Sequence, residues 1–146
     1  DNFTIHSAFS FNDTELTRVD PGFAVVVQDE GRELPLTPET QFSIRGRYEW
    51  ETANGDAYAQ IGLKHASKAL NSIVDTPDEP NSYQKSYSIV DAATGIRNVR
   101  NNWGMELYVQ NLGDERAQLH INRQDFFERI TVNRPRTVGL RISYDF

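Results

Sequence analysis

The chain ends in "RTVGLRISYDF", residues 136–146. Every second residue from Val138 to Phe146 is apolar or aromatic, and the residues between them are small or charged. A period of two is typical of a β-strand with one apolar and one polar face. Chain ends usually fray and carry polar residues. A strand that runs to a final aromatic residue therefore suggests that the terminus itself has a function.

Five further stretches alternate in the same way. They are "FTIHSAFSF" (3–11), "FSIRGRYEW" (42–50), "AYAQIGLKH" (57–65), "SIVDAATGI" (88–96) and "WGMELYVQN" (103–111). Helical periodicity is weak throughout, and only "RQDFFERI" (123–130) allows one or two helical turns within a loop. The pattern predicts an all-β fold, an antiparallel up-and-down meander of about six strands.

Long and short connections alternate strictly between these stretches. The long ones span about 12–41, 66–86 and 112–136, and the short ones are "ETANGD" (51–56), with an Asn-Gly hairpin signal, and "RNVRNN" (97–102). In a meander, this places every long loop at one end of the sheet and every short turn at the other. Outer-membrane β-barrels are built this way, with long extracellular loops and short periplasmic turns.

The apolar register of all six stretches contains no Asp, Glu, Lys or Arg, whereas the opposite register is rich in charge. Aromatic residues mark both ends of the apolar face: Phe9, Phe11 and Phe42 at the long-loop end, and Tyr48, Trp50, Trp103, Tyr144 and Phe146 at the short-turn end. Two aromatic girdles and strands close to the ~9–11 residues of a membrane crossing favour a transmembrane β-barrel. A soluble antiparallel sandwich also alternates, because one face of each sheet is buried.

Composition excludes several functions. The net charge of −6 and a pI near 5.0 argue against nucleic acid as a partner. The chain has no cysteine, so thiolate nucleophiles and cysteine-based metal sites are excluded. The histidines at positions 6, 65 and 120 lack metal-ligand spacing. We expect no enzyme activity, no catalytic residues, no metal and no cofactor.

The stretch "RPRTVGLRISYDF" (134–146) resembles the last strand of the TonB-dependent receptors of Gram-negative outer membranes. The stretch "WGMELYVQNLGDERA" (103–117) resembles the penultimate strand of that family. Further upstream, "AFSFNDTELT" (8–17) and "LPLTPETQFSIRGRYEW" (34–50) resemble the strand, loop and strand that precede it.

The resemblance implies that residues 1–146 are the C-terminal segment of a receptor barrel, its last six strands, without the plug domain and the earlier strands. It implies an active transport receptor of the cell outer membrane for a scarce nutrient, such as a siderophore, vitamin or oligosaccharide, driven by the TonB complex through an N-terminal region absent here. Bacterial barrels have about eight strands or more, and lipid does not tolerate an open sheet edge. We therefore expect a fragment rather than several copies that complete one barrel.

The resemblance and the register together assign candidate residues. The barrel-assembly machinery would read a terminal signal in the last strand, made of Gly139, Leu140, Ile142, Tyr144 and Phe146. Outer-membrane lipid would meet a periplasmic aromatic girdle of Tyr48, Trp50, Trp103, Tyr144 and Phe146. The polar register would face the lumen and the plug near the short-turn end, through Arg45, Arg47, Glu49, Glu106, Arg141 and Asp145.

Two alternatives remain for these assignments. The lumen-facing charges are also explained by cross-strand pairing that keeps a wet barrel wall polar. The whole chain is also compatible with a soluble all-β ligand-binding module of carbohydrate type. Recognition would occur on the long loops, whose aromatics are Phe23, Tyr83, Phe126 and Phe127, but the sequence assigns no residue to a ligand.

Overall fold

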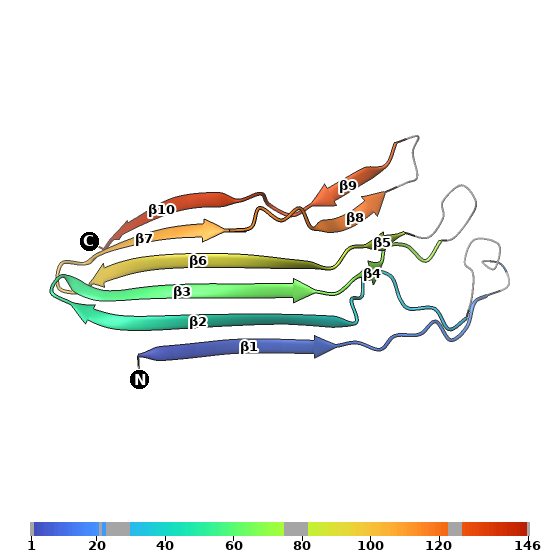
Figure 1. Ribbon diagram of the computed structural model, residues 1–146, viewed down its shortest axis with the longest axis horizontal. Coiled ribbons are helices and arrows are strands. Elements are labelled where there is room, and N and C mark those ends of the chain that lie inside the picture. Colours follow the sequence, from blue (N-terminus) through green and yellow to red (C-terminus); the bar gives the residue numbers. More distant parts are fainter. Residues whose placement is uncertain (1, 21, 23–29, 75–81, 123–126, 146) are drawn as a thin grey trace.

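The computed structural model describes residues 2–20, 22, 30–74, 82–122 and 127–145. Six long strands form one antiparallel sheet in the order β1-β2-β3-β6-β7-β10 (Figure 1). Their bounds are β1 Phe3–Phe11, β2 Thr40–Thr52, β3 Gly55–Ala66, β6 Tyr87–Asn98, β7 Trp103–Gln110 and β10 Thr137–Tyr144. The predicted all-β meander of six strands is confirmed.

Four short strands form two small sheets at one end of the long strands. Strand β4 (Ala69–Leu70) pairs with β5 (Tyr83–Gln84), and β8 (Gln118–Asn122) pairs with β9 (Arg129–Val132). The helical turns allowed for 123–130 are wrong at their last two residues, which belong to β9, and residues 123–126 lie outside the described part. In the described ranges no helix has the length and apolar character to cross a membrane.

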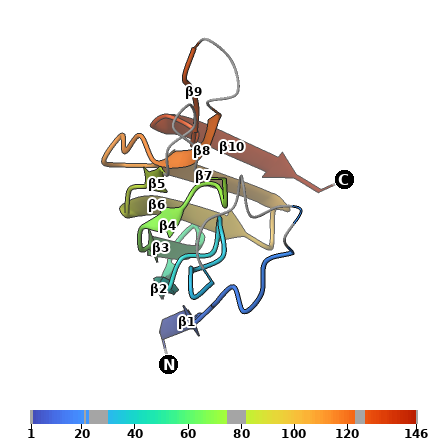
Figure 2. The ribbon, with the colours of Figure 1, turned by 90° about the vertical axis from the view of Figure 1, so that its right-hand side faces the viewer.

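The alternation of long and short connections is confirmed. Only residues 53–54 and 99–102 join the strands at one end, where both chain termini also lie (Figure 1). The other end carries the long loops 12–39, 67–86 and 111–136. Viewed from that end, the six strands follow one another in a single layer from β1 to β10 (Figure 2).

The first short turn requires glycine at position 55. Gly55 has a φ of +135°, and a Cβ there would collide with the Arg97 carbonyl oxygen of the neighbouring strand. The two short turns are also linked, because the Asn98 side chain donates a hydrogen bond of 2.6 Å to the Asn54 carbonyl oxygen. The turn end of the sheet is therefore locally well determined.

The buried side chains gather almost entirely at the long-loop end. Leu70 is fully buried, and nearly all the others lie where β3 ends or within the loops. The buried residues at this end are Ala66, Ala69, Leu70, Asn71, Ser82, Asn111, Ala117 and Ile121. The six-stranded sheet itself has no second layer among the described residues, so many of its large apolar side chains stay exposed and none of them is buried. The small core thus packs the loops together rather than one face of the sheet.

Asn71 joins the second long loop to the third. Its side chain accepts a hydrogen bond from the Ile121 N–H at 2.8 Å and donates one to the Ile121 carbonyl oxygen at 2.5 Å. Both backbone groups of Ile121 are therefore satisfied as a neighbouring strand would satisfy them. The Gln84 side chain adds a hydrogen bond to the Leu119 carbonyl oxygen at 2.8 Å. The first loop joins at the same place, where the Leu36 N–H donates to the Leu70 carbonyl oxygen at 2.7 Å.

The base of the third loop is closed by the segment "NLGDER" (111–116). The buried Asn111 side chain donates to the carbonyl oxygens of Glu115 at 2.9 Å and Arg134 at 3.0 Å. The Asp114 carboxylate accepts a hydrogen bond from the Arg136 N–H at 2.9 Å, and this bond holds the pKa of Asp114 below its ordinary value. The segment ties the start of the loop to its return into β10.

We predict that Asn71→Ala loosens the loop core, because it leaves both backbone groups of Ile121 buried without a partner. The cost of such an unsatisfied pair is about 1–3 kcal/mol. Amide exchange in residues 117–122 should rise about tenfold or more in the folded protein, measured by hydrogen–deuterium exchange. Asn101→Ala, in the exposed 99–102 turn, is the matched control and should leave these residues unchanged. Equal exchange in both variants would contradict the role of Asn71.

Candidate functional site: the two faces of the sheet

The strand register collects the six apolar alternations on one face. One row crosses all six strands through directly paired residues: Ile5, Gly46, Ile61, Ala92, Val109 and Val138. We call the face that carries this row the outer face and the opposite one the inner face. No residue paired on the outer face is Asp, Glu, Lys or Arg.

The outer face leaves large apolar side chains uncovered. Phe9 is 75% exposed and Ile142 is 70% exposed, and every exposed large hydrophobic side chain of the six long strands lies on this face. A continuous apolar surface across six strands exceeds what a monomeric soluble protein normally exposes. Such a surface fits contact with lipid or with another apolar layer.

An aromatic row crosses the outer face near the long-loop end. The rings of Phe9 and Phe42 stack with centroids 5.8 Å apart, and His65 stacks on Phe42 at 5.1 Å. The His65 Nδ1 lies 2.9 Å from the hydroxyl of Ser88, which is the next residue in the row. The sequence indicated the two phenylalanines but not the histidine that continues them.

A second set of aromatic residues lies at the short-turn end. Tyr48 and Trp50 stack at 5.8 Å, and Trp103 pairs directly with Tyr144. Phe42 and Trp50 are eight residues apart in β2, which is about 27 Å along the strand. If the strand crossed a membrane with a tilt of roughly 40°, the two residues would be about 20 Å apart along the membrane normal. This spacing is close to the apolar band of about 25 Å in transmembrane barrels. Phe146 lies outside the described residues.

The inner face carries a network of five residues, which we call the inner-face network. The Tyr58 hydroxyl donates a hydrogen bond to the Glu106 carboxylate, and the Arg47 guanidinium lies 3.7 Å above the Tyr58 ring. Arg47 also pairs with Glu49 at 2.8 Å, and Arg141 pairs with Glu106 at 2.8 Å. Four of the predicted lumen residues are thus brought together around a tyrosine that the sequence analysis did not select.

The other two predicted lumen residues lie apart from this network. Asp145 forms an ion pair of 4.0 Å with Arg97 at the short-turn edge. Arg45 is directly opposite His6 on one side and Gly62 on the other, four residues further from the short turn than Glu49. The expectation that Arg45 sits near the short-turn end is therefore wrong, because it lies in the middle of the sheet.

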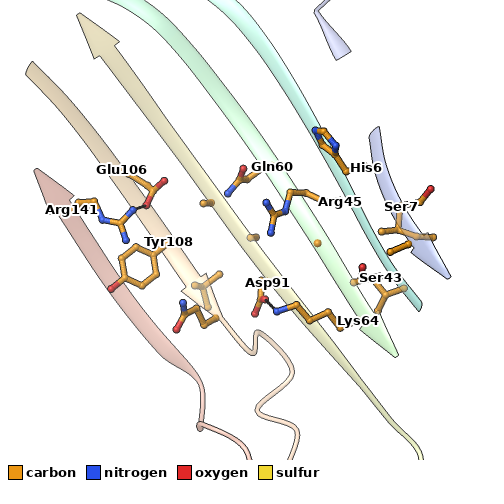
Figure 3. Close-up of a pocket in the computed structure, with 18 residues that line it drawn as sticks. His6, Ser7, Ser43, Arg45, Gln60, Lys64, Asp91, Glu106, Tyr108 and Arg141 are labelled. Atoms are coloured by element: carbon orange, nitrogen blue, oxygen red, sulfur yellow. Dashed lines mark hydrogen bonds and ion pairs between the residues drawn. The ribbon is translucent and has the colours of Figure 1, made fainter. Parts of the chain in front are cut away.

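A hollow occupies the middle of the inner face, and Figure 3 shows the residues that line it. Its polar lining includes His6, Arg45, Gln60, Lys64, Asp91, Glu106, Tyr108 and Arg141. Lys64 and Asp91 pair across it at 3.6 Å. Within the described ranges no three His, Asp or Glu side chains come together as a metal site would require.

Two tyrosines on the inner face cover glycines on the next strand. Tyr58 is paired with Gly95, and a Cβ at that glycine would lie 2.7 Å from the tyrosine ring. Tyr108 is paired with Gly139, where a Cβ would overlap the ring. Aromatic rings laid over cross-strand glycines fix register and shield the exposed backbone. Both partners stand in the polar register of the sequence, but only the pairing reveals which glycine each ring covers.

The loops offer few of the predicted recognition residues. Phe127 is 75% exposed, whereas Phe23 and Phe126 lie outside the described residues. Tyr83 has the Lys68 ammonium 5.2 Å from its ring centroid. Burial raises the pKa of Tyr83, and the neighbouring Glu33 carboxylate raises it further.

Comparison with solved structures finds close matches in shape at low sequence identity. BauA, the ferric preacinetobactin receptor from Acinetobacter baumannii, matches all of this chain with a TM-score of 0.73 and 16% identity. The ferric-catecholate import receptor Fiu from E. coli K12 matches 99% of it with a TM-score of 0.72 and 22% identity. The ferric yersiniabactin uptake receptor FyuA from Yersinia pestis matches 80% of it with a TM-score of 0.66 and 20% identity.

The chain has the fold of a TonB-dependent receptor barrel segment. It spans about a fifth of these receptors, 18% to 20% of their chains. No protein-family model matches the sequence, and no curated protein matches it. The receptor-barrel likeness therefore rests on the arrangement of the strands, in which an apolar outer face lies opposite a polar inner face.

We predict that Gly139→Ala destabilises the six-stranded sheet by about 1–3 kcal/mol, because its Cβ must displace the Tyr108 ring. The same change in a Tyr108→Ala background should be nearly neutral. Chemical unfolding of the protein would measure both in a double-mutant cycle. Gly113→Ala, where an added Cβ meets nothing within 4 Å, is the matched control. An equal loss with and without Tyr108 would mean that Gly139 acts through some other partner.

Proposed function

We propose that residues 1–146 form the C-terminal part of the β-barrel of a TonB-dependent transporter in a Gram-negative outer membrane. The chain supplies barrel wall and extracellular loops and has no enzymatic role. One observation carries the proposal: a charge-free outer face, with aromatic residues at both ends, lies opposite a polar, ion-paired inner face in a sheet shaped like known receptor barrels.

Lipid is the proposed environment of the outer face. A soluble module would need a second layer over this surface to remove it from water. The described chain provides none, since both small sheets lie beyond the end of the long strands. This is why we prefer a membrane barrel to a soluble carbohydrate-binding module.

The remaining strands of the same barrel are the proposed neighbours of β1 and β10. Each of these strands is paired on one side only in the described sheet. An unpaired edge is not tolerated in the hydrocarbon region. The likeness to about a fifth of each solved receptor supports completion by further strands of one long chain.

The other proposed partners follow from the two faces and from the last strand. The plug domain would lie against the inner face, and the TonB complex would act through a part of the receptor outside residues 1–146. The barrel-assembly machinery would recognise a signal in the terminal strand. In this signal the side chains of Leu140, Ile142 and Tyr144 lie on the outer face, and Gly139 lies next to Leu140 in the strand. Phe146 completes that signal in the proposal but lies outside the described residues.

A ferric siderophore is the substrate class that we propose first, ahead of vitamins and oligosaccharides. The solved structures of similar shape are receptors for ferric yersiniabactin, ferric catecholates and ferric preacinetobactin. The three long loops are the proposed capture surface, because hydrogen bonds and buried side chains join their described parts around Leu70 and Asn71.

Ala92 and Ala93 give a matched test of the membrane assignment, because they are adjacent in β6 and point to opposite faces. We predict that Ala92→Arg, near the middle of the outer face, costs about 2–4 kcal/mol of barrel stability. Ala93→Arg faces the lumen and should be tolerated. The fraction of full-length receptor that assembles in the outer membrane, read as heat-modifiable protein on gels, measures the difference.

The two variants together decide between the rival folds. A soluble module would place neither variant in the outer membrane, and a sheet whose outer face met water would tolerate Ala92→Arg as well as Ala93→Arg. Equal assembly of the two variants would therefore contradict the membrane wall.

A second experiment tests transport. We predict that deleting the gene for the full-length receptor abolishes growth on at least one ferric siderophore under iron limitation. The same loss should occur in a strain without TonB, and restoring the receptor there should not rescue it. Growth on a simple iron salt is the control. Unimpaired use of every ferric siderophore tested, combined with loss of a vitamin or oligosaccharide, would reassign the substrate class.

A further inference from the structure

Most of the charged side chains on the described inner face are paired with one another. Four ion pairs account for eight of them: Arg47 with Glu49, Lys64 with Asp91, Arg97 with Asp145, and Arg141 with Glu106. Arg45 is different, since it makes no hydrogen bond or ion pair with any described residue. It is the one cation on the described inner face that the barrel wall leaves without a partner.

The surroundings of Arg45 leave room for a group from outside the sheet. Its neighbour on β3 is Gly62, which has no side chain, and its neighbour on β1 is His6. The nearest acid in its row is Asp91, two strands away and about 10 Å distant at the usual strand spacing. Asp91 is already engaged by Lys64 and by the Asn111 N–H at 2.9 Å. Figure 3 shows the Arg45 side chain reaching into the hollow with no partner drawn to it.

A guanidinium that becomes covered by protein needs acceptors, because its five N–H donors lose water. In the proposed receptor the plug domain would fill the lumen and cover Arg45. A planar carboxylate matches the donor fork of arginine and can pair with it through two hydrogen bonds. The unpaired acids of the same face, Glu51 and Asp56, lie opposite each other beside the short turn, out of reach of Arg45.

We propose that Arg45 binds a carboxylate of the plug domain, with Gly62 providing the gap through which that side chain approaches. This inference rests on the proposed transporter function. Of the six predicted lumen residues, it leaves only Arg45 as a plug contact, because the other five already form ion pairs within the sheet. Arg47 in particular has Tyr58, Glu49 and Gln60 as partners.

Hydrogen–deuterium exchange of the full-length receptor in detergent tests the contact. Arg45→Glu should speed exchange in one plug segment that contains an Asp or Glu by about tenfold or more, the effect of losing a charge-assisted hydrogen bond. If the charge reversal prevents assembly of the receptor, Arg45→Gln replaces it, and this variant should also speed exchange in that plug segment. Arg45→Lys should lie between wild type and Arg45→Gln, since lysine keeps the charge without the fork. Arg47→Gln is the matched control and should leave plug exchange unchanged.

A charge swap completes the test. Replacing the acid in the affected plug segment by Arg should restore protection in the Arg45→Glu receptor. Wild-type plug exchange in Arg45→Gln, or an equal rise in Arg47→Gln, would overturn the contact while leaving the transporter function intact. Weaker ferric siderophore binding with an unchanged plug would overturn it in favour of a substrate contact. A full-length protein without any plug segment would overturn both proposals.

Discussion

Strand register is the constraint on which the rest of this structure depends. Side chains alternate between faces with a period of two, so a slip of one residue in any pairing would place charges such as Arg47 or Glu106 among the apolar side chains. In a bilayer that error would cost several kcal/mol for each charge near the midplane. The rings of Tyr58 and Tyr108 over their cross-strand glycines oppose such slips, because each ring fits only where the facing residue lacks a side chain.

Correct register collects the apolar side chains on one face of the sheet, and this face must be removed from water if the sheet is to be stable. A soluble domain buries one face of its sheet against a second layer, whereas here the described sheet is a single layer with apolar side chains on the outside. Lipid would bury the outer face in place of a second layer. On the inner face, the charges neutralise one another in pairs, Arg47 with Glu49 and Arg141 with Glu106. Protein packing in the ordinary sense is left to the loop end, where Leu70 and Ile121 are buried.

The strands, their order and their faces could be predicted from the sequence because each depends on local alternation and on loop length. The partners within a face could not, because they depend on register between strands far apart in sequence. Tyr58 and Gly95 are 37 residues apart, and nothing near either residue indicates the other. Arg45 is a different case, because its distance from the 53–54 turn can be counted along β2 in the sequence, and that count places it in the middle of the strand. Asn71 was missed because a buried polar side chain in a loop looks like any other loop asparagine until its partner Ile121 is known.

The loop core and the inner face of the sheet provide partners for their polar and charged groups in different ways. Within the loop core, Asn71 and Asn111 use their amide groups on backbone atoms, so the three long loops meet on a preformed base and exposed groups such as Phe127 are free for recognition. Along the wall, ion pairs cancel charge locally, which lets a polar face be covered without stranding charges. Arg45 has neither kind of partner among the described residues, neither a backbone hydrogen bond nor an ion pair. On the described inner face it is the one cation without a partner, so it would give the proposed plug domain a single positive anchor point and favour one orientation of that plug.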